Sequence, residues 1–174
     1  MTVSAKDDES TATSANASAT VNYTNVAPAI NIVKSVSPSS IPEGTTGPVT
    51  YTYTVTYTSS AGAFDPLTIN SLVDDNGTSG TADDFTPAFI GGDTDNDNRL
   101  DAGETWTYKK VNHSVPAKNA GQTHINKVTV SASDAESTAT SDNASATVTY
   151  LDVAPVLVCI DAVHADGLIF QLLS

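Results

Sequence analysis

One segment of the chain occurs twice, and this repeat sets the size of the unit that can fold. Residues 2–28 and 129–155 align without gaps over 27 positions, of which 21 are identical, at an offset of 127 residues. This period is longer than the repeats of small solenoids and matches the size of one β-sandwich domain. The repeat therefore predicts folded units of about 127 residues, strung together like beads.

The same arithmetic predicts the domain boundaries. We expect residues 1–28 to be the C-terminal strands of a preceding, partial repeat, residues 29–155 to be a complete sandwich, and residues 156–174 to be the first strand or tail of a following repeat. The last segment is markedly apolar and needs covering. We expect copies to cover one another by head-to-tail strand addition, which would give a filament. The alternative is an excerpt of a tandem array whose ends continue in the parent protein.

Strict alternation of side chains predicts an all-β fold. In residues 49–58, Val49, Tyr51, Tyr53, Val55 and Tyr57 fall on one face and threonines on the other. Further strands are expected near residues 30–36, 66–73, 85–90, 104–111, 123–133 and 144–150, and so many strands separated by turn residues favour an Ig-like two-sheet β-sandwich with a calcium-binding loop. The alternation favours a core position for the tyrosines over a sugar-stacking stripe.

The charge of the chain excludes several partners. Acidic residues outnumber basic ones 20 to 7, which argues against nucleic acid and against anionic membranes as partners. No run approaches the roughly 20 apolar residues of a membrane span. Cys159 is the single cysteine, so no internal disulfide can form. Half of the acids lie between Asp65 and Glu104 with one base, Arg99, and this concentration of charge favours a bound divalent cation.

The strongest motif is an acidic loop at residues 93–104. Counted from Asp93, acids occupy loop positions 1, 3, 5, 9 and 12, which is the ligand spacing of an EF-hand loop. Asn98 stands at position 6, where glycine is usual, and asparagine tolerates the left-handed backbone needed there. The predicted Ca²⁺ ligands are Asp93, Asp95, Asp97, the Arg99 carbonyl, Asp101 and Glu104.

A second acidic set surrounds the turn-rich residues 76–80. It could form another, weaker calcium site, or it could be a solvated loop with turn-forming aspartates. Residues 7–9 and 134–136 are equivalent acidic positions of the repeat and are predicted to be hairpin turns, with a calcium site at the linker as the alternative. The members of the second acidic set are Asp65, Asp74, Asp75, Asp83 and Asp84.

Four segments carry a resemblance to a known class of protein. They are KSVSPSSIPEG, VTYTYTVTYTS, DPLTINSLVDD and GDTDNDNRLDAGETWTY. Together they resemble the tandem extracellular repeat domains of large bacterial and archaeal surface proteins, and the acidic loop is similar to those of dockerins. The resemblance implies an Ig-like sandwich, calcium in the loops, and a structural or adhesive role without catalytic residues.

These observations predict a calcium-stabilised structural module of a secreted surface or matrix protein. An adhesive module that binds a glycan or a protein is the alternative, and an enzyme is not expected. His113, His124 and His164 are too scattered for a zinc site and are expected on the surface or in loops. Lys34 could form an isopeptide crosslink with an Asn or Asp, but the sequence does not identify the carboxylate that such a bond needs, so this possibility is not favoured.

Overall fold

The computed structural model describes residues 1–60 and 65–157 of the chain. The described residues form strands and contain no helix that could cross a membrane. The fold is all-β, as predicted. The strands are β1 (Thr2–Lys6), β2 (Ala12–Asn16), β3 (Ile30–Ser37), β4 (Ser40–Pro42), β5 (Val49–Tyr57), β6 (Thr68–Asp74), β7 (Ala88–Gly91), β8 (Thr105–His113), β9 (Thr123–Ser133) and β10 (Ala139–Leu151).

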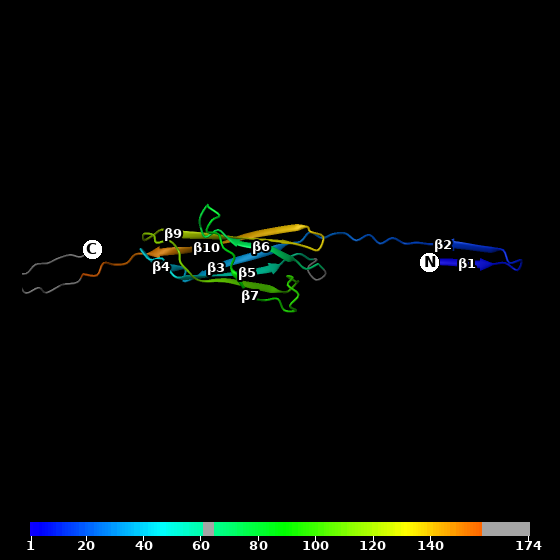
Figure 1. Ribbon diagram of the computed structural model, residues 1–174, viewed down its shortest axis with the longest axis horizontal. Helices are drawn as coiled ribbons and strands as arrows, with labels where there is room; N and C mark the ends of the chain where they lie inside the picture. Colours follow the sequence, from blue (N-terminus) through cyan, green and yellow to red (C-terminus); the bar gives the residue numbers. More distant parts are fainter. Residues whose placement is uncertain (61–64, 158–174) are drawn as a thin grey trace, which may run out of the picture.

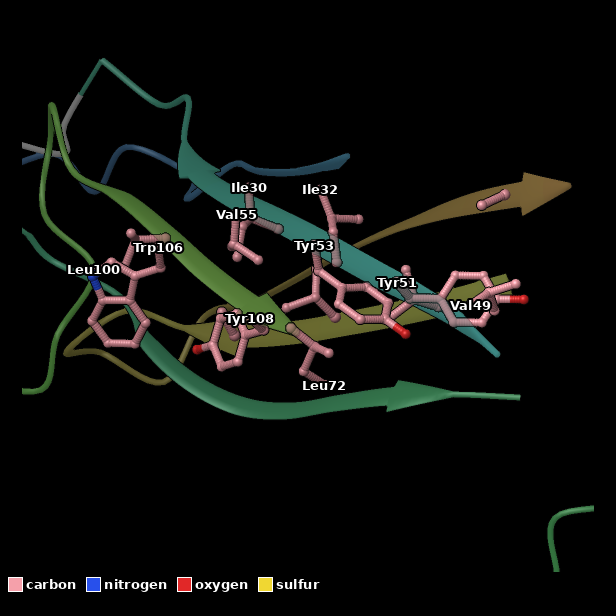
Figure 2. Close-up of a cluster of buried hydrophobic side chains, with 14 of the residues drawn as sticks. Ile30, Ile32, Val49, Tyr51, Tyr53, Val55, Leu72, Leu100, Trp106 and Tyr108 are labelled. Atoms are coloured by element: carbon pink, nitrogen blue, oxygen red, sulfur yellow. The ribbon is translucent and has the colours of Figure 1, made fainter. Parts of the chain in front are cut away.

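Eight of these strands form two four-stranded sheets that enclose one core (Figure 1). One sheet has the order β3-β5-β8-β7 and the other the order β4-β10-β9-β6. Neighbouring strands are antiparallel except β4 and β10, which pair in parallel. The core side chains come from both sheets; those labelled in Figure 2 are Ile30, Ile32, Val49, Tyr51, Tyr53, Val55, Leu72, Leu100, Trp106 and Tyr108.

The alternating strand β5 supplies the centre of the core. Tyr51, Tyr53 and Val55 have no exposed surface, whereas the threonines between them are half-buried on the opposite face. A pleated strand turns successive side chains to opposite faces, so a period of two in the sequence becomes one buried face. The expectation that the tyrosines belong to the core is confirmed.

The sequence patterns do not predict β4. Pro38 directly follows β3 and has no N–H to continue its ladder, and the chain passes from the first sheet to the second. The three residues of β4 pair with the end of β10, and Ile41 is buried there. A strand of three residues is too short for the alternation of period two to be recognised from sequence alone.

The two copies of the repeated segment form the same hairpin. Thr2 pairs with Asn16, and Thr129 pairs with Asn143, so the strand registers are identical after the offset of 127 residues. The turns match as well, since residues 7–9 and 134–136 both lie in the hairpin turns that were predicted for them. Figure 1 shows β1 and β2 apart from the sandwich, joined to it by an extended segment.

The environment of the two hairpins differs. Val130 has no exposed surface, whereas its repeat equivalent Val3 is 54% exposed. The reason is that β9 belongs to one of the two sheets that enclose the core, whereas β1 pairs with β2 alone among the described residues. The segment from residue 158 onward lies outside the described residues, so its predicted role as a first strand or tail stays a prediction.

The repeat provides a matched pair of substitutions. We expect Val130→Ala to lower the free energy of unfolding by about 2 kcal/mol, because it removes two buried methyl groups and leaves a cavity. Val3→Ala makes the same change in the same local sequence and should alter stability by less than about 0.5 kcal/mol. Urea denaturation monitored by fluorescence of Trp106 measures both. Equal losses would mean that the two hairpins are packed alike.

Candidate metal centre

The acidic loop lies between β7 and β8 and is anchored to the core at one internal residue. Leu100, at loop position 8, has no exposed surface. Its backbone N–H donates to the carbonyl of Leu67 at 2.8 Å, and the N–H of Leu67 donates back at 3.0 Å. This two-residue bridge holds the middle of the loop against the sandwich. Asp95 and Asp97 are exposed, whereas Asp93, Arg99 and Asp101 are partly buried.

Aspartate side chains within the loop organise its backbone. Asp93 accepts the N–H of Asn96 at 2.8 Å and that of Asn98 at 3.0 Å, and Asp97 accepts the N–H of Arg99 at 2.7 Å. Asn96 and Asn98 both have φ of 62°, in the left-handed region that asparagine tolerates. The left-handed backbone predicted at Asn98 is confirmed.

The loop places the five predicted carboxylates in two adjoining groups of three. Asp93, Asp95 and Glu104 have carboxylate oxygens within 4.8 Å of one another, and so do Asp95, Asp97 and Asp101. Asp95 belongs to both groups, so the two groups adjoin each other at this residue. Carboxylate oxygens gathered in this way could hold a metal ion, and hard oxygen ligands are of the kind that Ca²⁺ takes in proteins. Arg99, whose carbonyl is the sixth predicted ligand, lies in the same loop.

Repulsion between the ionised carboxylates destabilises the folded acidic loop. Burial raises the pKa of Asp101, and the negative charges of Asp97, Asp95 and Glu104 raise it further. The effect of Arg99 is in the opposite direction and is smaller. A cation held among these oxygens would stabilise the ionised carboxylates, and it would therefore stabilise the folded loop.

Glu104, at the last position of the loop, connects the loop to the core through hydrogen bonds. Its side chain is buried, and it accepts four hydrogen bonds: from the Thr94 N–H at 2.6 Å, the Thr94 hydroxyl at 2.8 Å, the Asp101 N–H at 3.1 Å and Trp106 Nε1 at 2.9 Å. Burial by itself raises the pKa of Glu104, but these donors together lower it to about 2. The sequence motif does not identify Thr94 and Trp106, although both lie within two residues of predicted ligands.

The second acidic set is dispersed. Among the described residues, no group of three or more candidate metal ligands within 4.8 Å contains two members of this set. Asp75 accepts backbone N–H groups of Gly77 and Lys127, each at 2.8 Å, and Asp83 accepts from Asn76 and Thr78 at 3.0 and 2.9 Å. These bonds are those of turn-forming aspartates, which is the alternative that the sequence left open.

Asp65 joins a different group. Its carboxylate lies within 4.8 Å of those of Asp134 and Glu136, in the turn between β9 and β10. Asp65 accepts the N–H of Ala135 at 3.2 Å, and Asp134 accepts that of Thr138 at 2.6 Å. This group corresponds to the linker site that the repeat suggested as an alternative for residues 134–136.

Sequence reasoning was wrong about one histidine. His124 was expected on the surface or in a loop, but it lies on β9 and only 3% of it is exposed. Burial lowers its pKa. The alternation of residues 123–133 could have predicted this burial. His124 is an even number of positions from the buried Val128 and Val130, so it lies on the same face of the strand. His164 lies outside the described residues.

The hydrogen bonds of Glu104 predict a dependence of stability on pH. Its pKa is lower in the folded protein than the ordinary 4.5, so its stabilising effect is complete above about pH 4.5 and is lost as the pH falls toward about 2. In metal-free buffer at neutral pH, we expect Glu104→Gln to cost about 1–3 kcal/mol of unfolding free energy. Urea denaturation at several pH values measures this gap.

The exposed Glu9 provides the control. Glu9→Gln should leave stability within about 0.5 kcal/mol of the wild type at every pH. A gap between the wild type and Glu104→Gln that stays constant down to about pH 2 would show that the Glu104 carboxylate is not stabilised by its four donors.

Comparisons of the chain with protein-family models, with curated proteins and with solved structures give no match. The proposal that follows therefore depends on the geometry of the acidic loop and of the sandwich.

Proposed function

We propose that this chain is a calcium-stabilised structural module of an extracellular surface or matrix protein. The observation that carries the proposal is the acidic loop, in which two groups of carboxylates adjoin at Asp95 and the backbone is held to the core by Leu100. A loop of this kind costs stability when it is empty, because its charges repel, and adds stability when a cation binds. Calcium suits it, since Ca²⁺ accepts six to eight oxygen ligands in flexible geometry.

An Ig-like topology is part of this proposal. If β3 is strand A, the sheet order β3-β5-β8-β7 corresponds to A-B-E-D. The other sheet, β4-β10-β9-β6, then corresponds to G-F-C with β4 as an additional edge strand. This correspondence supports a module that is joined to its neighbours at opposite ends, which is the arrangement of bead-like extracellular arrays.

An extracellular location agrees with the chemistry of the loop. Extracellular calcium modules bind in the range of about 10⁻⁴–10⁻³ M, which tolerates a weaker loop than a cytosolic sensor does. Asn98 at position 6 is a feature that we expect to weaken binding, since glycine adopts positive φ at lower cost. The acidic surface and the single cysteine agree with a secreted domain stabilised by metal instead of disulfides.

An adhesive role is the second candidate, and one feature favours it. A hollow of about 390 Å³ opens beside the acidic loop, between β6 and β8. Asp93 and Asn98 line one part of it, and Phe89, Trp106 and Tyr108 line another. Phe89 is 48% exposed, so an aromatic face is available next to the proposed cation. Loss of ligand binding on Phe89→Ala, with calcium binding intact, would favour adhesion.

Calcium binding should be measurable directly. We expect Ca²⁺ added to chelated protein to release heat in calorimetric titration and to raise the melting temperature, by an amount equivalent to about 2.7 kcal/mol at a hundredfold excess over Kd. Mg²⁺ should bind less tightly, because it demands a tighter octahedral shell. Removing calcium should also make residues 65–104 the first site of proteolysis.

Two aspartate variants make the test specific. Asp93→Ala should remove most of the calcium-dependent shift, because Asp93 supplies loop position 1. Asp83→Ala changes an exposed aspartate of the second acidic set and should leave the shift intact. The proposal fails if calcium causes neither heat nor a shift in the wild type, or if the two variants lose the shift equally.

We also propose that copies of the chain contact one another head to tail by strand addition. Residues 1–28 carry core-type side chains without a cover: Val21 and Tyr23 are 72% and 94% exposed, whereas their repeat equivalents Val148 and Tyr150 are buried. An apolar strand from a neighbouring copy would cover them. Residues 156–174 have the required composition, although 158–174 lie outside the described residues.

Deletion of residues 156–174 tests this contact. The full chain should sediment as a concentration-dependent assembly, and the truncated chain should be monomeric, because the added strand is missing. If the truncated protein assembles like the full chain, or if the full chain is monomeric at every concentration, strand addition is excluded.

A further inference from the structure

A lysine occupies a core position on the first strand of the sandwich. On β3, Ile30, Ile32 and Lys34 face inward in alternation, and Lys34 is only 7% exposed. Removing an ammonium group from water costs several kcal/mol unless it is paired and hydrogen-bonded. A lysine in this position therefore requires buried polar or charged partners around its amine.

Three buried polar residues surround the amine of Lys34. Nζ lies 2.7 Å from Oδ2 of Asp74, on β6, and contacts Oδ1 of Asn126, on β9. Asp74 and Asn126 have no exposed surface. The hydroxyl of Tyr53 donates to the same Oδ2 of Asp74.

Aromatic rings complete the enclosure. Nζ of Lys34 lies 4.6 Å from the ring centroid of Tyr51 and 5.4 Å from that of Tyr53. These rings, labelled in Figure 2, extend from β5 into the core. The amine, the carboxyl and the amide therefore meet in a site from which bulk water is excluded, where electrostatic interactions are strong.

The amide of Asn126 is only half satisfied. Its Oδ1 contacts Lys34, but its Nδ2 is buried and has no hydrogen-bond partner among the described residues. Buried amide groups in folded proteins nearly always have partners for both atoms. An asparagine present only to accept a bond from Lys34 would leave this donor buried and unpaired, which destabilises the folded state.

We propose that Lys34 and Asn126 join through an isopeptide bond between Nζ and Cγ, with Asp74 as the catalytic residue. In the first step the Lys34 ammonium transfers a proton to the Asp74 carboxylate, so that both groups are neutral. The neutral amine attacks Cγ of Asn126, while the Asp74 carboxyl protonates Oδ1. The tetrahedral intermediate then collapses.

The collapse conserves atoms and needs no oxidant, reductant or added group. Nζ gives one proton to Asp74, the proton on Oδ1 passes to Nδ2, and Nδ2 leaves as ammonia. The Nζ–Cγ bond forms, the Cγ–Nδ2 bond breaks, and Asp74 ends protonated, as it was before the attack. The leaving group is Nδ2, for which the described part of the chain provides no hydrogen-bond partner.

The electrostatic environment agrees with the first step. Burial lowers the pKa of Lys34, and the hydrogen bond and charge of Asp74 oppose this only in part. A neutral amine is the form that can attack a carbonyl carbon. A low-dielectric core favours neutral partners over the charged pair, so proton transfer from Lys34 to Asp74 removes two charges from the site.

The bond would join the two sheets. Lys34 lies on the edge strand of one sheet and Asn126 on an inner strand of the other, 92 positions later in the sequence. A crosslink across a loop of this length restricts the unfolded chain strongly. It would also prevent β3 from separating from β9 under tension, in a chain whose one cysteine can form no internal disulfide.

Intact mass spectrometry of the denatured full chain tests the proposal. We expect the wild type to be lighter than its sequence mass by one ammonia, about 17 Da. Tandem spectra after trypsin should contain a single species that joins the peptide with Lys34 to the peptide with Asn126. Lys34→Met, Asn126→Ala and Asp74→Asn should each show the full sequence mass.

Two controls remove other sources of the same change. Asn76-Gly77 could lose ammonia by forming a succinimide, so Asn76→Ala should keep the loss if the isopeptide bond is its source. Lys127→Met replaces an exposed lysine adjacent to Asn126 and should also keep it. Asp93→Ala and chelated protein should keep it as well, so that a failure of the calcium proposal and a failure of this one are distinguishable.

Thermal unfolding adds a second measurement. Asn126→Ala should melt lower than the wild type by roughly 10 °C or more, since it loses the covalent constraint. The proposal is overturned if wild-type protein that has folded completely retains its sequence mass, or if the linked peptides involve other residues. The wild-type spectrum decides this even where a variant does not fold.

Discussion

The rest of the structure depends on one core that two sheets enclose and that every second residue of each strand must fill. On β5 this condition is met by Tyr51, Tyr53 and Val55, none of which retains exposed surface. Burial of such side chains contributes about 1.5–3 kcal/mol each, which makes the alternation the main source of stability. Whatever lies on the inward face of a strand, including a lysine or an asparagine, must then find partners within the core.

The acidic loop uses this core as a support. Its charged residues are held in place because Leu100 is buried and bridged to Leu67, and because Glu104 accepts bonds from Thr94, Asp101 and Trp106. The loop backbone is thus held at several points by the core and by its own side chains, which would reduce the ordering that binding of a cation requires. The remaining repulsion among the carboxylates is what a cation would relieve.

The acidic loop and the buried lysine lie in different parts of the sandwich, and each would stabilise a different pair of strands. A cation in the loop would stabilise the connection between β7 and β8, whereas a bond between Lys34 and Asn126 would join β3 to β9. Both are ways of stabilising a domain without disulfides. The β1–β2 hairpin lies outside this core, and its Val3 is exposed where the repeat equivalent Val130 is buried.

The sequence by itself determined the features that depend on neighbouring residues. Period-two alternation gave most of the strands and the buried tyrosines, the repeat gave two hairpins of identical register, and the spacing of the acidic loop brought Asp93, Asp95 and Glu104 together. Only the tertiary structure decided which strands share a sheet, that Asp65 lies with Asp134, and that Asp74 and Asn126 meet Lys34 from 40 and 92 positions away. The physical reason is that alternation specifies the face on which a side chain lies but not the strand opposite it. That partner is chosen when the whole core packs.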